Sequence, residues 1–183
     1  MKKVCVFLAD GFEEVEALTA VDLLRRARVY VDTVSIKDDY KVHGAHGIYV
    51  VTEDLFEEAE FEDTDMIVLP GGMPGTTNLM QHAGVRKIVK AFVDAGKPVG
   101  AICAAPTILA DLGILEGKKA TCYPACEDSM AGAVLTGAPV TVDGNVITSR
   151  GVGTAIDFAL ELIKVLCGEA VAKKISSDIV YAK

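Results

Sequence analysis

The segment around Cys103 has the residue types expected of a nucleophile held at a sharp turn. An apolar run at residues 98–102 predicts a buried strand leading into the cysteine, and a helical pattern at 104–112 follows it. Small neighbours permit the tight turn of a nucleophile elbow, and Pro106 suits the first helical turn. The helix end is expected to lower the pKa of the thiol and give a thiolate at neutral pH. The alternative is an inert core cysteine, because free cysteines are often buried.

The other four cysteines have no comparable setting. Cys5 falls inside an expected strand and Cys167 at the end of an expected helix, so both are expected to pack in the core. Cys122 and Cys126 stand near a loop, where they could oxidise, but nothing else marks them. Five scattered cysteines do not suggest a disulfide framework. No nearby ligand pair completes a zinc site, so no metal is expected.

A carboxyl is the stronger candidate for a partner of the thiolate. Glu16 follows the first expected strand and points to the same end of the sheet as Cys103. A partly desolvated carboxyl there would stay protonated and donate a hydrogen bond to the sulfur. The alternative is that Glu13, Glu14 and Glu16 only form an acidic first turn that suits the helix dipole.

Two further features are candidate parts of the site: a histidine and a glycine-rich turn. Residue 104 is alanine and no histidine lies near Cys103 in sequence, so a Cys–His pair would require His46 or His82 to approach through the fold. The Pro-Gly-Gly turn at 70–72 can expose backbone amides to an anion. Its alternative is an ordinary turn at the end of a strand.

Apolar periodicity predicts strands alternating with helices along the whole chain. We expect strands at 4–9, 29–36, 65–69, 98–102 and 119–122, a strand or hairpin within 40–52, a hairpin of 140–142 with 145–148, and helices at 12–27, 84–95, 104–112, 155–166 and 169–180. Thr154 is expected to cap the fourth helix, and 53–63 to be a loop with a helical turn. The pattern predicts one doubly wound α/β domain with a mainly parallel sheet. The loops 10–16, 69–75 and 102–106 would then converge at the carboxyl ends of the strands.

Composition limits the possible partners. The chain has 183 residues and a net charge of −8, which disfavours binding to nucleic acid or to an anionic membrane surface. Lys2 and Lys3 precede an apolar stretch that ends at Asp10, too short for most signal peptides, so a buried first strand is expected. These features predict a cytoplasmic protein.

Four motifs together resemble the DJ-1/ThiJ/PfpI superfamily, and its DJ-1-like branch in particular. They are the glutamate motif at 10–16, the glycine turn at 68–72, the cysteine elbow at 101–106 and the closing loop at 148–154. The resemblance implies a flavodoxin-like three-layer sandwich, a single domain over residues 1–183 and a homodimer. It implies that Cys103 is the oxidation-prone cysteine and Glu16 its protonated partner.

The resemblance also implies roles for residues around this pair. The amides of Gly72 and Ala104 would bind an oxyanion or the oxygens of an oxidised sulfur. Arg26 and Asp22 match positions near the dimer interface and the rim of the site, and His46 and Arg150 are assigned to the same group. His46 stands where several relatives have arginine. Tyr123 stands where animal members have histidine, and Val152 replaces the usual proline.

The activity implied by the resemblance is a cofactor-free, glyoxalase-type or deglycase-type reaction on reactive carbonyls or glycated groups. The alternative is an oxidative-stress sensor or redox-regulated chaperone without turnover. A cysteine peptidase is less favoured, because Ala104 replaces the histidine that follows the cysteine in protease-like members. No cofactor is expected, since no glycine-rich phosphate fingerprint or P-loop is present.

Overall fold

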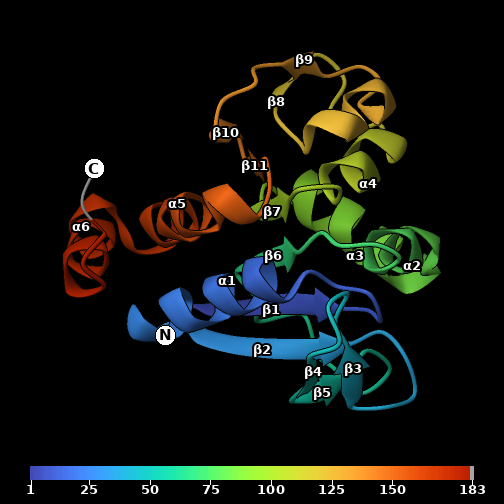
Figure 1. Cartoon of the computed structure of the whole chain (residues 1–183), viewed down its shortest axis with the longest axis horizontal. Helices are drawn as coiled ribbons and strands as arrows, with labels where there is room; N and C mark the ends of the chain where they lie inside the picture. The colour runs from blue at the N-terminus through green and yellow to red at the C-terminus, as the bar shows by residue number, and fades with distance from the viewer. Residues whose placement is uncertain (182–183) are drawn as a thin grey trace.

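Seven strands form the central sheet of the computed structural model, which describes residues 1–181 (Figure 1). In spatial order they are β10 (Val140–Asp143), β11 (Val146–Ser149), β7 (Val99–Ile102), β6 (Met66–Leu69), β1 (Lys3–Leu8), β2 (Tyr30–Ser35) and β5 (Asp54–Leu55). All neighbours are parallel except the β10–β11 hairpin. The predicted α/β fold with a mainly parallel sheet is therefore confirmed.

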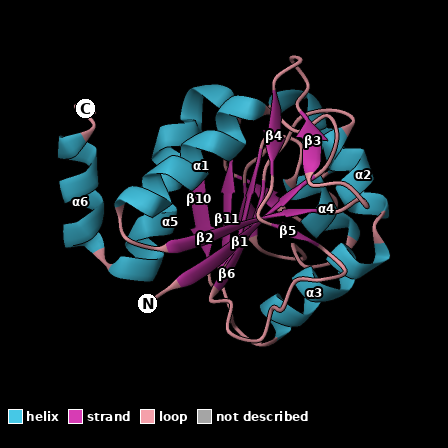
Figure 2. Ribbon diagram, turned by 90° about the horizontal axis from the view of Figure 1, so that it is seen from below, coloured by secondary structure: helices cyan, strands magenta, loops and turns pink. Residues whose placement is uncertain are grey.

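Helices cover both faces of the sheet, which Figure 2 shows between two helical layers. The first layer holds α1 (Glu14–Arg26), α5 (Ala155–Cys167) and, packed against α5, α6 (Glu169–Asp178). The second holds α2 (Gly75–Gln81), α3 (Ala83–Asp94) and α4 (Pro106–Asp111). Side chains of β1 alternate between the two layers, with Val4 and Val6 facing the first and Cys5 and Phe7 the second. This explains why β1 is a continuous apolar run.

Smaller elements lie at the ends of the sheet. The hairpin of β3 (Lys41–His43) and β4 (Tyr49–Val51) is joined to the start of α1 by a bridge between Phe12 and Gly44. The pair β8 (Lys119–Ala120) and β9 (Val134–Leu135) flanks the 3-10 helix η1 (Pro124–Ser129). A second 3-10 turn, η2 (Val152–Thr154), precedes α5. No helix within the described range is long and apolar enough to cross a membrane.

Three local predictions need correction. Helix α2 was not expected, because its segment follows a proline- and glycine-rich turn and has no side-chain cap. The loop expected at 53–63 contains β5, whose pairing with β2 is a tertiary contact that no local pattern shows. Thr154 does not cap α5 through its side chain. Its hydroxyl instead hydrogen-bonds to Ser149 Oγ (2.7 Å) and to the carbonyl of Gly151 (2.9 Å), which closes the loop after β11.

Candidate active site

Cys103 occupies the turn between β7 and α4 in a strained backbone conformation. Its φ is 65°, a left-handed value that residues with a side chain rarely adopt. Two hydrogen bonds hold it there: its amide donates to the Ser149 carbonyl (3.0 Å), and the Tyr123 amide donates to its carbonyl (2.8 Å). Pro106 is the first residue of α4. The turn is thus a nucleophile elbow in which α4 leads away from a presented sulfur.

Two backbone amides and one carboxyl converge on the sulfur of Cys103. The amides of Gly72 and Ala104 and the side chain of Glu16 all act on its thiol from close range: the two amides lower the pKa of Cys103 and Glu16 raises it. Gly72 has φ of 91°, and a Cβ there would collide with the backbone of Gly11, Phe12 and Glu13, so only glycine fits. The structure therefore brings together the four residues expected at the centre of the site.

Glu16 reaches the sulfur from the first turns of α1. The residue is only 1% exposed, and its Oε2 accepts a hydrogen bond from the Gly71 amide at 2.9 Å. Its Oε1 is buried and has no regular hydrogen-bond partner among residues 1–181, which leaves it available to the thiol. A Cβ on Gly71 would lie 2.5 Å from the Cβ of Cys103 and 2.8 Å from Glu16 Oε2. Glycine at 71 thus permits the approach of the two side chains.

Burial dominates the electrostatics of this pair. It raises the pKa of Glu16 to about 7, although the Gly71 amide and the neighbouring Cys103 side chain lower it. Burial, together with the negative charge of Glu16, raises the pKa of Cys103 to about 12, although the Gly72 and Ala104 amides lower it. The prediction that the helix end alone would give a thiolate is therefore wrong. The pair therefore loses its first proton near pH 7. In the singly charged pair, a thiolate forms only while the proton is on Glu16, because the repulsion between the two groups is then absent.

The pair opens into a cleft of about 800 Å³. Its rim carries His46 from the loop between β3 and β4, Tyr123 before η1, and Arg150 after β11. Arg150 Nη1 lies 3.4 Å from Glu127 Oε1. The remaining lining residues are Glu13, Val15, Pro124, Gly151, Val152, Gly153 and Thr154.

Other expected rim residues lie elsewhere. Arg26 and Asp22 form an exposed ion pair of 2.6 Å near the far end of α1, and neither lines the cleft. Their expected place at the rim is corrected for this reason: the helix carries them away from Glu16. His82 accepts a hydrogen bond from the Val85 amide (3.1 Å) and packs on Phe56, so it caps α3 and does not serve Cys103.

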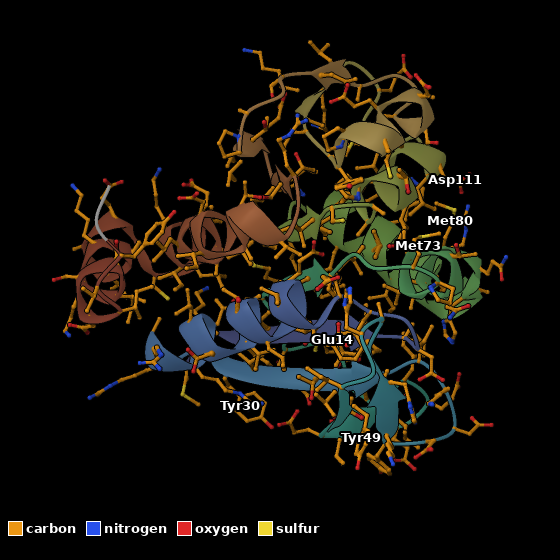
Figure 3. The ribbon with its side chains drawn as sticks, viewed as in Figure 1. Glu14, Tyr30, Tyr49, Met73, Met80 and Asp111 are labelled. Carbon is orange, nitrogen blue, oxygen red and sulfur yellow. The ribbon has the colours of Figure 1, made fainter. Side chains whose placement is uncertain are left out.

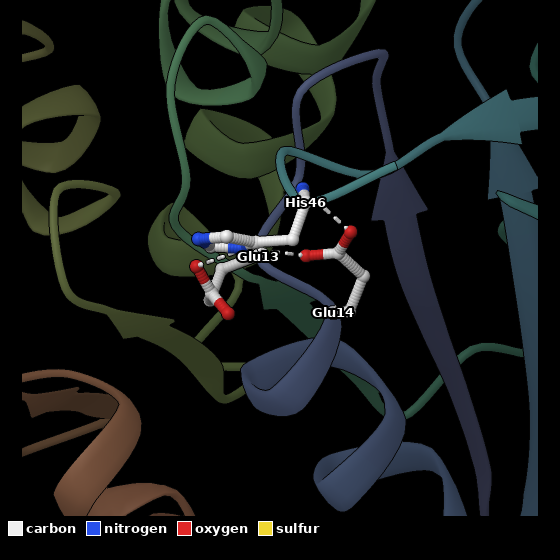
Figure 4. A group of neighbouring side chains, drawn as sticks. All are labelled: Glu13, Glu14 and His46. Atoms are coloured by element: carbon white, nitrogen blue, oxygen red, sulfur yellow. Dashed lines mark hydrogen bonds and ion pairs between the residues drawn. The ribbon is translucent and has the colours of Figure 1, made fainter. Parts of the chain in front are cut away.

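The three glutamates of the first turns of α1 have different partners. Glu14 is buried between α1 and the hairpin that carries Tyr49 (Figure 3). Its Oε1 accepts from the amides of His46 (2.7 Å) and Ile48 (3.3 Å), and its Oε2 lies 2.9 Å from His46 Nδ1. Glu13 Oε2 lies 3.5 Å from the same nitrogen, as Figure 4 shows. The glutamates of this turn therefore make specific tertiary contacts in addition to any interaction with the helix dipole.

The Glu13, Glu14 and His46 side chains form an ion-pair cluster. Their polar atoms lie within 4.8 Å of one another, a spacing that a cation could use. However, both oxygens of Glu14 already accept hydrogen bonds from the loop that they anchor. A metal would have to break these bonds, so we assign the cluster as a salt-bridged anchor. The sequence missed this role of Glu14, since its partners are 32 and 34 residues away.

The other cysteines lack the surroundings of Cys103. All five are free thiols. Cys5 is buried against Thr64 (3.3 Å), and burial raises its pKa. Cys122 is buried with its Sγ 3.3 Å from the Tyr123 carbonyl, and burial raises its pKa to about 11. Burial also raises the pKa of the partly exposed Cys126 and Cys167.

Known proteins match this chain closely in sequence and in structure. The model of the DJ-1/PfpI family matches residues 2–165. DJ-1 homolog B of Arabidopsis thaliana is 37% identical over 98% of this chain, which spans only 41% of that relative. A deglycase of Pyrococcus abyssi is 36% identical over 90% of this chain and 99% of its own length. The structure of oxidized Toxoplasma gondii DJ-1 superposes with a TM-score of 0.96 at 37% identity, over 100% of both chains.

Proposed function

The chain belongs to the DJ-1/PfpI family, and on this premise we propose that it is a cofactor-independent enzyme acting on reactive carbonyl compounds through Cys103. One observation carries the proposal: a buried carboxyl of raised pKa and two backbone amides meet at a single sulfur in an open cleft. The relative from Pyrococcus abyssi that is named a deglycase supports the same substrate class.

The first step would be addition of the Cys103 thiolate to the aldehyde carbon of a 2-oxoaldehyde. The carbon–sulfur bond forms, the carbonyl electrons move to oxygen, and the Glu16 proton neutralises that oxygen to give a hemithioacetal. The amides of Gly72 and Ala104, which act on the thiol, would stabilise the developing oxyanion. Sugar-derived aldehydes of early glycation adducts would enter by the same addition.

The second stage would return Glu16 to its protonated form and release the product. The Glu16 carboxylate removes the proton from the carbon that bears sulfur, giving an enediol, and the neighbouring carbon is then protonated to give a thioester. Water hydrolyses the thioester, which releases a 2-hydroxy acid and regenerates the thiol–carboxyl pair. The net reaction adds one water to the 2-oxoaldehyde, so no redox cofactor takes part.

Lactate formation from methylglyoxal by the purified protein tests this proposal. The wild-type protein is compared with Cys103→Ala, and Cys126→Ala serves as the matched control because Cys126 is a partly exposed thiol outside the cleft. We expect lactate from wild type and Cys126→Ala and none above background from Cys103→Ala. Equal rates for wild type and Cys103→Ala would reject the proposal.

The second candidate is a redox sensor at the same cysteine, favoured by the similarity to the oxidized Toxoplasma gondii structure. Peroxide would oxidise the sulfur to a sulfinate, whose oxygens would accept hydrogen bonds from the two amides and from protonated Glu16. Mass spectrometry after mild peroxide treatment tests this. Oxidation of Cys122 or Cys126 before Cys103 would contradict the sensor role. A peptidase is less favoured, because no histidine in the described part of the chain hydrogen-bonds to Cys103.

We also propose a homodimer, supported by apolar side chains exposed on two adjacent elements. Val15 and Leu18 on α1 are exposed, as are Ile48, Tyr49 and Val51 around β4. Asp22 and Arg26 continue the same helix. Light scattering after size-exclusion chromatography tests this: a mass of twice 19.3 kDa is expected, and a monomer at micromolar concentration would contradict it.

A further inference from the structure

The cleft above Cys103 concentrates negative charge from one helical turn. Glu13 and Glu16 both line it with the sulfur, and Glu14 of the same turn binds the backbone of His46, which also lines the cleft. Glu13 is close enough that its charge raises the pKa of Glu16. A thiolate at Cys103 adds further negative charge in the same space. The ease with which the Cys103–Glu16 pair loses a proton therefore depends on what compensates Glu13.

His46 is the group placed to compensate this charge. Its Nδ1 lies 2.9 Å from Glu14 Oε2 and 3.5 Å from Glu13 Oε2. The ring lines the cleft, and the imidazole stands at the mouth with 68% of its side chain exposed. The loop itself is held by backbone amides on Glu14 Oε1. The ring can therefore be changed without releasing the loop.

We propose that Glu13 and His46 are opposing charges that set the pH at which the Cys103–Glu16 pair loses its first proton. Glu13 holds the proton on the pair, and the His46 cation favours its loss. Both are positioning residues, since they act through Glu16 and not on the substrate. The inference rests on the proposed function only in taking Cys103 as the reactive sulfur.

The other charged groups around the cleft do not duplicate this role. Arg150 lines the cleft from the loop after β11, but its guanidinium is paired with Glu127 of η1. Tyr123 also lines the cleft, and it carries no positive charge. Of the described residues that line the cleft, His46 is thus the cation that pairs with the carboxylates of α1.

The two charges predict shifts of opposite sign. Glu13→Gln removes a negative charge, so the pair should lose its proton at a lower pH. His46→Gln keeps a donor to Glu14 but removes the positive charge, so the midpoint should rise. A unit charge that lines the same partly solvated cleft corresponds to a shift of about 0.5–1 pH unit in each direction. His46→Arg keeps a permanent cation and should leave the midpoint at or below the wild-type value.

The rate of Cys103 alkylation by iodoacetamide between pH 5 and 10 measures this midpoint, because the thiolate is the reacting form. Cys103 modification in the full-length protein is followed by peptide mass spectrometry, which separates it from the other four cysteines. His43→Gln is the matched control, since His43 is an exposed histidine of the same hairpin that does not line the cleft.

Opposite shifts for Glu13→Gln and His46→Gln, with none for His43→Gln, are the expected result. Absent shifts, shifts of the same sign, or failure of His46→Arg to restore the wild-type midpoint would overturn the proposal. Lactate formation from methylglyoxal is recorded separately on the same samples. Shifts without turnover would reject the carbonyl activity and retain this inference, whereas turnover without shifts would do the reverse.

Discussion

The molecule has two buried carboxyl groups that can be compared, Glu16 next to Cys103 and Asp32 in β2, which are 1% and 2% exposed. Each has one oxygen without a regular hydrogen-bond partner within residues 1–181. Burial raises the pKa of Glu16 to about 7 and that of Asp32 to about 6. Their neighbours differ. Glu16 faces a thiol, two amides and a cleft, whereas Asp32 faces the Asp54 carboxyl and Lys3 Nζ at 3.7 Å.

The comparison shows that a raised carboxyl pKa does not by itself mark a reactive site. Asp32 lies near the Asp54 carboxyl, whose negative charge helps to raise the pKa of Asp32, and the thiol opposite it in the sheet, Cys5, is fully buried. Glu16 lies beside a sulfur that lines an open cleft. The chemistry therefore depends on the companion group and on access, while burial supplies the shift in both places.

The largest expected effect is on activity, which should depend on Glu16 and not on Asp32. Glu16→Gln removes the group that donates and accepts protons, so kcat/KM for methylglyoxal should fall about 10²–10⁴-fold. Asp32→Asn removes the other buried carboxyl outside the cleft and should leave kcat/KM within about twofold, since surface and core changes away from the site act on stability. Comparable losses in both variants would mean that the Glu16 effect is not chemical.

The second effect concerns the glycine turn that presents an amide to the sulfur. Gly72→Ala places a Cβ against the backbone of residues 11–13 at a φ of 91°. We expect a loss of about 2–3 kcal/mol in the free energy of unfolding, measured by urea denaturation. Gly96→Ala is the matched control, because Gly96 also has a positive φ (72°) but open space around its Cβ position. An equal loss in both would show that the close approach at Gly72 adds nothing.

The third effect is a pH dependence of the free energy of unfolding that both carboxyls should produce. A carboxyl whose pKa is raised on folding stabilises the fold below its unfolded value and loses that contribution as pH rises through the folded value. The windows are therefore about pH 4 to 6 for Asp32 and about 4.5 to 7 for Glu16. The free energy of unfolding of Asp32→Asn and of Glu16→Gln, taken relative to wild type, should each rise by about 2 kcal/mol from the lower to the upper end of its window.

Urea denaturation at pH 4, 5, 6 and 7 measures this gain. Wild-type stability should fall relative to both variants as pH rises. A pH profile parallel to wild type would show that the replaced carboxyl is not protonated on folding. If both variants gain stability at higher pH but only Glu16→Gln loses activity, then both carboxyls are protonated in the fold and only Glu16 takes part in the chemistry.

The smallest effect concerns the far end of α1. Arg26→Ala removes an exposed i,i+4 ion pair with Asp22 and should change the free energy of unfolding by less than about 0.5 kcal/mol, because such pairs are well solvated. A larger loss that depends on protein concentration would instead place the pair in a dimer interface. Chemical denaturation at two protein concentrations distinguishes these outcomes.

Much of this organisation could be predicted from the sequence. Buried parallel strands are apolar runs, so β1, β2, β6, β7 and the β10–β11 hairpin were predicted to within a few residues. The elbow at Cys103 and the approach of Glu16 followed from the rule that strand ends converge. The structure brings these residues together, although their chemical roles stay predictions.

Features that depend on tertiary contacts were not accessible from the sequence. The pKa of Cys103 is set by burial and by Glu16, which outweigh the local helix end on which the prediction relied. Glu14 anchors a loop more than thirty residues away, so adjacent glutamates could not be told apart. The Thr154 hydroxyl hydrogen-bonds to Ser149 and Gly151 and does not cap α5, because the closing loop offers competing partners.

The most direct test of a shared charge between Cys103 and Glu16 is thiolate absorbance at 240 nm as a function of pH, taken as the difference between wild type and Cys103→Ala. The Cys103–Glu16 pair is expected to lose its first proton near pH 7, and we expect part of that charge to appear as thiolate absorbance at this pH in the wild type. In Glu16→Gln the step should persist, since the neutral amide removes the repulsion and can still donate to sulfur. If no thiolate forms below pH 10 in either protein, the charge resides on Glu16 alone and the nucleophilic role of Cys103 is contradicted.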